Sequence, residues 1–207
     1  MKKFLLFIIC IYSSTAIASG AIFSNKLNRC KISKSVLNNY EPEEFQPTNN
    51  LLRQTGQEAT YSGAKIIIKG KLLDQHCVPI SDAKIYLWQT GRDGKYPYKP
   101  LRTKVNKNIF KLTNSSTFTG SGIATTNNKG EFYFITLYPG QNPNKAYVNI
   151  RVEHRDLGSL QTQLFLSSKF AHAQNCGEIH HALFNVSQEL TVYDFDIVMP
   201  GSTLRRY

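Results

Sequence analysis

The sequence predicts an all-β protein, an antiparallel β-sandwich, on three observations. Short runs of β-branched and aromatic residues recur at hairpin spacing, turn residues stand between them, and no helical periodicity separates one run from the next. The chain has 207 residues, of which 41% are hydrophobic, with 13 Gly and 8 Pro. This composition excludes collagen, a coiled coil and general disorder, and the length suits one domain.

Residues 1–18 have the order of a signal peptide. Lys2 and Lys3 precede a short apolar run over 4–12, and the small residues Ala16 and Ala18 follow it. Because this run is about half as long as a membrane-spanning helix, we expect cleavage after Ala18 and export to the periplasm or the outside. No later stretch is apolar enough to cross a bilayer, so we expect no transmembrane segment in the mature chain.

The expected mature chain is basic and has an odd number of cysteines. Cleavage removes two lysines and no acidic residue, which lowers the formal net charge from +11 to +9. This charge favours acidic partners, anionic ligands or a membrane surface. Cys30, Cys77 and Cys176 remain, and in an oxidising compartment they allow one disulfide. We expect Cys77 to be a member of the bridge, with either Cys30 or Cys176 as its partner.

The elements follow in order after a polar, irregular arm over 19–62, which carries prolines and no sustained period. The sandwich is expected over 63–207. Its first strand lies at 66–73 and is interrupted by Gly70, and the second lies at 83–89. The turn between them spans 74–82.

Five further segments have strand patterns, and their turns contain Gly, Pro and Asn. These strands are expected over 119–126, 131–138, 146–154, 160–166 and 191–199. Phe132, Phe134, Ile150 and Val152 alternate with other residues and are expected to face the core. The remaining segment, 167–190, could hold a helical turn or two.

A basic segment over 91–111 joins the second and third strands. It contains Arg92, Lys95, Lys99 and Arg102, and its prolines oppose regular structure. The segment is either a solvated loop or an anion-binding rim around Tyr96 and Tyr98.

Three residues have the spacing of metal ligands on a helix. His172, Cys176 and His180 are four residues apart, and His181 is adjacent. They could hold zinc, but Gly177 would interrupt such a helix, and the alternative is a loop whose cysteine is bridged or buried.

Several segments together resemble the intradiol ring-cleavage dioxygenases, the family of the protocatechuate 3,4-dioxygenase beta chain and catechol 1,2-dioxygenase. The resemblance covers about residues 49–201. The segments that carry it are Asn50-Leu51-Leu52-Arg53, Leu87-Trp88-Gln89 with Gly94-Lys95-Tyr96, residues 118–122 and 130–140, and Tyr193-Asp194-Phe195-Asp196-Ile197-Val198.

The resemblance implies a ferric ion held by two tyrosinates and two histidines. Tyr96 matches the first tyrosine, whereas Asn142 stands at the second, and Tyr147 and Asn149 stand at the two histidines. Neutral amides give Fe(III) little charge compensation, so we expect the inherited iron site to be inactive and no cofactor to be bound.

Two further positions of that site can be assigned by the same resemblance. Asn144 stands where the family has a substrate-binding arginine, and Gln163 matches a supporting glutamine. A one-residue shift would bring Tyr138 or Tyr147 to the second tyrosine position. It would not restore the histidine pair, because His154 should face the opposite side of its strand from Asn149.

Three functions follow from these residues. The first is an exported binding or assembly module without ring-cleaving activity, whose partner is an unknown protein or a small anionic or aromatic ligand. The second is an active Fe(III)-dependent dioxygenase acting on a catechol-like substrate. The third is a carrier of a small aromatic acid, and none of the three is expected to bind nucleic acid.

Overall fold

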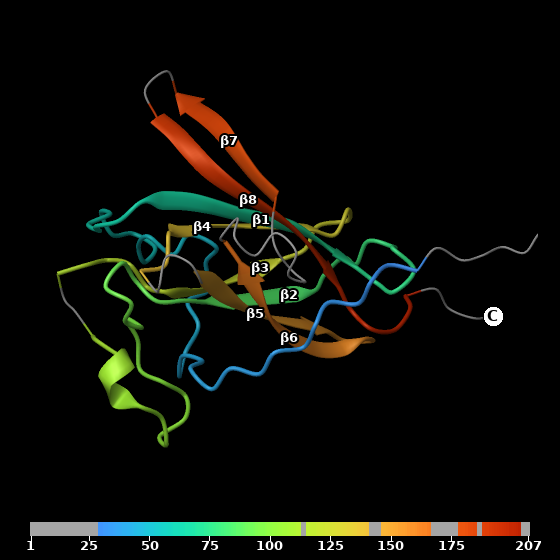
Figure 1. The fold of residues 1–207 in the computed structure, drawn as a ribbon, viewed down its shortest axis with the longest axis horizontal. Coiled ribbons are helices and arrows are strands. Elements are labelled where there is room, and N and C mark those ends of the chain that lie inside the picture. The colour runs from blue at the N-terminus through green and yellow to red at the C-terminus, as the bar shows by residue number, and fades with distance from the viewer. Residues whose placement is uncertain (1–28, 113–114, 141–145, 167–177, 186–187, 204–207) are drawn as a thin grey trace, which may run out of the picture.

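The computed structural model describes residues 29–112, 115–140, 146–166, 178–185 and 188–203, which form two β-sheets (Figure 1). Within these ranges the one helical element is the 3₁₀ turn η1, Lys107–Ile109. The strands are β1 Lys65–Leu73, β2 Lys84–Trp88, β3 Ser121–Thr125, β4 Glu131–Leu137, β5 Tyr147–His154, β6 Gly158–Phe165, β7 Glu178–Asn185 and β8 Gln188–Val198.

The two sheets have the strand orders β4-β1-β8-β7 and β3-β2-β5-β6. All neighbouring strands run antiparallel except β1 and β8, which are parallel. Phe132, Phe134, Ile150 and Val152 lie in the shared core between the sheets, as their alternation predicts. The predicted antiparallel β-sandwich is therefore confirmed.

The first strand does not break at Gly70. β1 pairs continuously with β4 from Lys65 to Lys71. A Cβ atom at Gly70 would lie 2.5 Å from the carbonyl oxygen of Phe195 and 2.8 Å from the ring of Phe132. Gly70 thus allows close packing against β1 and does not interrupt the strand.

The expected helical turn in 167–190 is wrong over the part that the structure describes. Residues 178–185 form β7, an edge strand paired with β8. His180 therefore lies in a strand and not on the helix that the predicted zinc site required. His172 and Cys176 lie outside the described residues, so the proposed metal cluster has no structural support, and the described residues contain no other group of three metal-ligating side chains.

The described part of the N-terminal arm, residues 29–62, contains no helix or strand, passes the edge strand β6 and reaches the outer face of its sheet at Asn38. The amide of Val36 donates to the carbonyl of Gln161, and the hydroxyl of Thr162 donates to the carbonyl of Lys34. A disulfide joins Cys30 to Cys77, one of the two pairings that the sequence left open. Among the described residues, no helix is long and apolar enough to span a membrane.

Candidate functional site

The side chains of β5 alternate between the core and the outer face of the sheet. Val148 and Ile150 belong to the core between the sheets. Tyr147 and Asn149 have the other parity and therefore face outward, toward the arm. The site lies on this outer face, between β5, β6, the arm and the loop that follows β2.

Asn149 is fully buried and makes hydrogen bonds with three neighbours. Its side-chain oxygen accepts from the Nδ2 of Asn38 at 2.8 Å and from the Nε2 of Gln163 at 3.1 Å. Its Nδ2 donates to the carbonyl oxygen of Trp88 at 3.2 Å. Gln163 is the register partner of Asn149 on β6, which explains why the two side chains meet.

Tyr96 meets the same cluster from the loop after β2. Its ring is 2% exposed and packs against Tyr40, Tyr98 and Phe110 at centroid distances of 5.3 to 5.6 Å. Burial is the main cause that raises the pKa of the Tyr96 phenol, the nearby phenol of Tyr147 adds to the rise, and hydrogen bonds with Asn149 and Asn38 oppose it. The phenol is therefore neutral at physiological pH.

Two close backbone contacts hold the loop that carries Tyr96. Residues 91–94 form a tight turn in which the amide of Gly94, at φ +72°, donates to the carbonyl of Gly91. Gly140 packs on this turn so closely that a Cβ atom would lie 1.6 Å from the carbonyl oxygen of Arg92. Gly140, which belongs to the Pro139-Gly140 break predicted from the sequence, thus packs against the loop and supports it.

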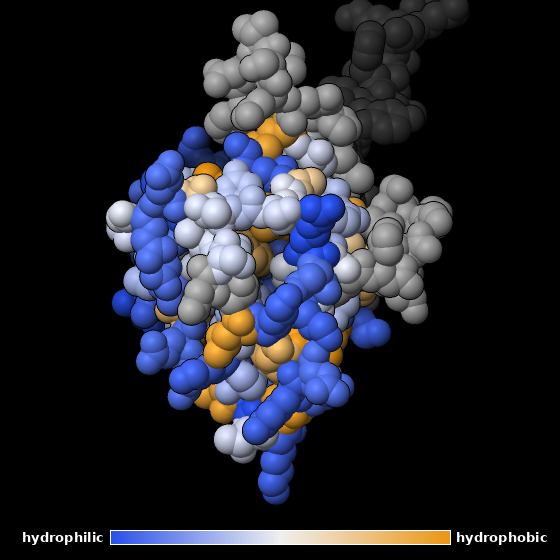
Figure 2. All heavy atoms as spheres, turned by 90° about the vertical axis from the view of Figure 1, so that its left-hand side faces the viewer, coloured by the Kyte–Doolittle hydropathy of each residue, from blue (hydrophilic) through white to orange (hydrophobic). Residues whose placement is uncertain are grey.

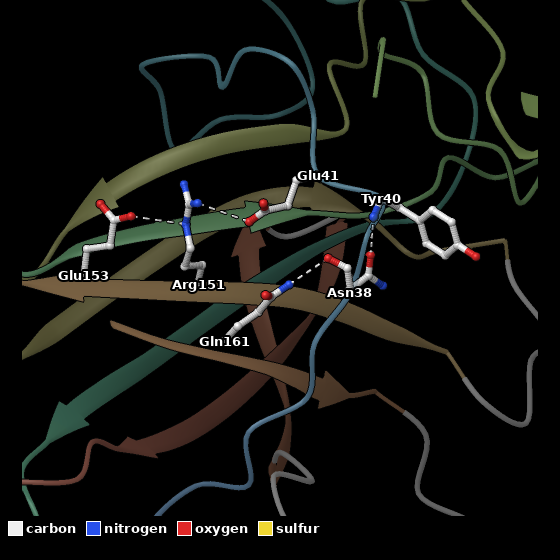
Figure 3. Close-up of polar contacts among 6 residues, drawn as sticks. All are labelled: Asn38, Tyr40, Glu41, Arg151, Glu153 and Gln161. Carbon is white, nitrogen blue, oxygen red and sulfur yellow. Dashed lines mark hydrogen bonds and ion pairs between the residues drawn. The ribbon is translucent and has the colours of Figure 1, made fainter. Parts of the chain in front are cut away.

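The arm contributes a side chain that the sequence analysis did not single out. The Nδ2 of Asn38 reaches Asn149. Figure 3 shows the neighbouring contacts of Asn38, whose Oδ1 accepts from the amide of Tyr40 and whose backbone carbonyl accepts from Gln161. Asn38 stands among polar residues without a distinguishing motif. Its contact with Asn149 spans 111 residues of sequence, so no local pattern could have revealed it.

A charged clasp, formed by Glu41, Phe45, Tyr86, Arg151 and Glu153, fastens the arm beside Asn38. The guanidinium of Arg151 lies 3.3 Å from the Glu41 carboxylate and 3.4 Å from that of Glu153 (Figure 3). It also stacks 4.5 Å from the centroid of Tyr86 and 5.6 Å from that of Phe45. These contacts hold the arm against β2 and β5.

The other residues expected in the site are placed as follows. Asn142 and Asn144 lie outside the described residues. Tyr138 packs against Tyr193, at a centroid distance of 6.4 Å, and does not join the cluster around Tyr96. His154 lies at the end of β5, where its Nδ1 accepts from the amide of Asp156.

The basic loop does not form one rim around its tyrosines. Tyr96 and Tyr98 are both buried in the aromatic cluster. Arg92 and Lys95 line a separate cavity, whose described lining does not include Lys99 or Arg102.

These side chains do not fit a ferric ion. Around Asn149 the structure brings together neutral phenols and amides, and the amide oxygen of Asn149 already accepts two hydrogen bonds from Asn38 and Gln163. Fe(III) needs anionic oxygen donors or imidazoles, and none of the described contacts of Tyr96 and Asn149 supplies one.

Comparisons with known proteins agree on one family. A family model described as "Dioxygenase" matches residues 39–199. A protein of Rickettsia bellii (strain RML369-C) named "Putative dioxygenase" is 53% identical over 208 residues and is matched over the full length of both chains. The protocatechuate 3,4-dioxygenase beta chain of Burkholderia cepacia is 26% identical over 105 residues, 50% of this chain and 42% of the relative.

Solved structures show the same fold. The dioxygenase domain of a dioxygenase and carbohydrate-binding fusion protein from Streptomyces sp. SirexAA-E matches with a TM-score of 0.61 at 16% identity, covering 83% of this chain and 100% of that domain. An intradiol ring-cleavage dioxygenase from Tetranychus urticae matches with a TM-score of 0.60 at 19% identity, covering 83% of this chain and 95% of the other.

Proposed function

Because the chain belongs to the intradiol ring-cleavage dioxygenase family, we propose that it is an exported member of that family. In this proposal it does not cleave aromatic rings and acts as a binding or assembly module. The observation that carries the proposal is the hydrogen bond between Asn38 and Asn149. The arm of the protein itself contacts the position where the family resemblance requires an iron-binding histidine.

The donor chemistry supports the same proposal. Ring cleavage in this family needs tyrosinates that compensate the charge of Fe(III). At Tyr96 the described hydrogen-bonding neighbours are the amides of Asn38 and Asn149 and the phenol of Tyr147, so the two imidazoles that the family resemblance requires are missing there. Amide side chains therefore occupy the position beside Tyr96, and the described neighbours of Tyr96 and Asn149 include no imidazole that would bind iron.

Two features support export. Residues 1–18 have the order of a signal peptide, and the disulfide between Cys30 and Cys77 is a bond that persists in oxidising compartments. N-terminal sequencing of the protein from the periplasm or the medium tests this part. A protein that begins at Ser19 supports export, and intact Met1 in the cytosol contradicts it.

Metal analysis of the purified protein, together with an oxygen-uptake assay on catechol and protocatechuate, tests the loss of activity. We expect a colourless protein that takes up no oxygen after incubation with iron. Stoichiometric iron with a visible tyrosinate absorption band, or cleavage of either substrate, would overturn the proposal.

One observation favours the active dioxygenase as a second candidate. Tyr147 lies close enough to Tyr96 to influence the pKa of its phenol, so two phenols do meet at the site. The same metal analysis separates the candidates, because an active enzyme must hold iron at this pair.

A further inference from the structure

The cavity lined by Arg92 and Lys95 lies beside the loop that carries Tyr96, on the side away from the aromatic cluster. Its volume is about 510 Å³, and its described lining comes from the end of the arm at 60–62, from the 91–97 loop and from Lys111, Ser115, Ser116 and Phe118. Pockets of roughly 300–1,000 Å³ are typical of small-molecule sites. The loops of this end of the molecule lie on the left of Figure 1 and face the viewer in Figure 2, where hydrophilic side chains surround smaller apolar areas.

The cavity combines an apolar floor with a cationic rim. Phe118 and Leu137 are buried at 6% and 2% exposure and form the floor with Tyr61 and Pro97. Arg92, Lys95 and Lys111 contribute positive charge to the lining, against the single acidic residue Asp93.

We propose that this cavity binds a small organic carboxylate with an apolar body. The floor would cover the ring or chain of the ligand, and the cations would pair with its carboxylate. The excess of positive over negative charge around the cavity favours an anion over a neutral molecule of the same shape.

The backbone separates this cavity from the cluster around Asn149. The amide of Tyr96 donates to the carbonyl of Ile109, and the amide of Lys111 donates to the carbonyl of Tyr96, so the chain is extended at this point. In an extended segment, successive side chains point to opposite sides. Tyr96 therefore enters the aromatic cluster, while Lys95 lines the cavity.

The cationic rim is held in place before a ligand binds. The carbonyl of Arg92 packs against Gly140, and its guanidinium donates to the hydroxyl of Ser62 at 2.8 Å. The ammonium of Lys95 donates to the carbonyl of Asn108. Asp93 lies 3.7 Å from the ammonium of Lys111, a long ion pair between exposed side chains that an incoming carboxylate could replace.

Binding of benzoate, compared with its neutral isostere benzamide and with acetate, tests the proposal by calorimetry and by NMR of the backbone amides. We expect benzoate to bind about tenfold more tightly than either control, because benzamide lacks the charge and acetate lacks the apolar body. The amides of residues 91–95 and 118 should shift, and those of Asn38 and Asn149 should not.

Charge variants provide matched controls. Lys95→Gln should weaken benzoate binding about tenfold, Arg92→Lys should weaken it less than Arg92→Gln, and Asp93→Asn should strengthen it. Lys99→Gln and Arg102→Gln change the same basic loop outside the cavity and should leave the affinity unchanged.

Three results would overturn this inference: benzoate and benzamide binding equally, Lys99→Gln weakening binding as much as Lys95→Gln, or no benzoate binding by a folded protein. Shifts at Asn38 and Asn149 would instead place the ligand in the family's old site and would overturn the assignment to this cavity, without contradicting a binding module that does not cleave rings. If benzoate does not bind in the cavity, the iron measurements are unaffected. The two proposals can therefore be refuted separately.

Discussion

Asn38 in the arm donates a 2.8 Å hydrogen bond to the buried side-chain oxygen of Asn149 in β5, 111 residues further along the chain. This contact makes the arm part of the sandwich rather than an appendage to it. The arm thus covers Asn149 on the outer face of β5 through a polar interaction within the chain.

Removal of the Asn38 side chain should lower the free energy of unfolding. In Asn38→Ala the oxygen of Asn149 keeps its bond from Gln163 and loses the other, and a buried polar group with a missing partner costs about 1–3 kcal/mol. Denaturant unfolding measures the change. Asn39→Ala, at the exposed neighbouring position, is the control and should have little effect. Equal stability of Asn38→Ala and the wild type would show that the arm does not close the site.

The charged clasp should contribute to stability through Arg151. Arg151→Gln leaves the Glu41 carboxylate, whose side chain is only 14% exposed, without its ion-pair partner. We expect a loss of about 1–3 kcal/mol. Arg155→Gln removes a cation that is 84% exposed and should change the stability by less than about 0.5 kcal/mol. A double-mutant cycle with Glu41→Gln should give a coupling energy that the Arg155 and Asp156 pair lacks.

The strands were predictable where their determinants are local. Phe132 and Phe134 are two residues apart in a run of β-branched and aromatic residues, and the turn before β4 has the Asn and Gly residues that hairpins use. Gly70 and β7 were not predictable in the same way. The packing of Phe132 on Gly70 is a tertiary contact, and residues 178–185 become a strand because β8 offers them a hydrogen-bonding edge.

The site was predictable only in part, for a similar reason. Tyr96 and Asn149 could be placed by their order in the family pattern, since that pattern follows the chain. Asn38 and Glu41 reach the site from an arm without regular structure, and their partners Asn149 and Arg151 are more than a hundred residues away. A single sequence carries no signal for such pairs.

Asp74 should make stability depend on pH in the acid range. Its buried carboxylate accepts from the amides of His76, Val78 and Thr203 at 2.8 to 3.0 Å. Burial by itself would raise the pKa of Asp74, but these hydrogen bonds outweigh it and hold the pKa below its ordinary value of 3.8. The stabilisation is therefore complete above the unfolded-state pKa and is lost as the pH falls through the lower folded-state pKa.

The pH dependence of unfolding for Asp74→Asn tests this relationship. The variant should be less stable than the wild type at neutral pH, and the difference should shrink as the pH falls below about 3.8. Asp196→Asn, at an exposed position, should follow the wild-type curve. A difference between Asp74→Asn and the wild type that stays constant down to low pH would contradict the assignment.

Peptide mapping without reductant should recover Cys30 linked to Cys77. The bridge joins two cysteines that are 47 residues apart in the sequence. A loop of this size corresponds to about 4 kcal/mol of stabilisation in the chain-entropy model. The variant Cys30→Ser with Cys77→Ser should lose stability of that order, whereas Cys176→Ser should keep the bridge intact. Free alkylation of Cys30 and Cys77 in the native protein would refute the pairing.

Restoring the ligands of the iron site should require changes in the arm as well as in the sandwich. The family pattern suggests Asn142→Tyr, Tyr147→His and Asn149→His, which together with Tyr96 would supply two phenolates and two imidazoles. Asn142 lies outside the described residues and enters from the resemblance alone. In this triple variant the Asn38 amide would still occupy the space beside position 149 and compete with the metal.

We therefore expect the triple variant to bind little iron, and the same variant with Asn38→Gly to bind iron stoichiometrically and to show a visible tyrosinate band. A triple variant combined with Asn39→Gly controls for flexibility of the arm, since it introduces the same glycine one position away. Equal iron uptake by both glycine variants would show that arm flexibility matters and that the Asn38 contact does not. No uptake by a folded Asn38→Gly combination would mean that the buried surroundings of Tyr96 oppose the metal even with a complete set of ligands.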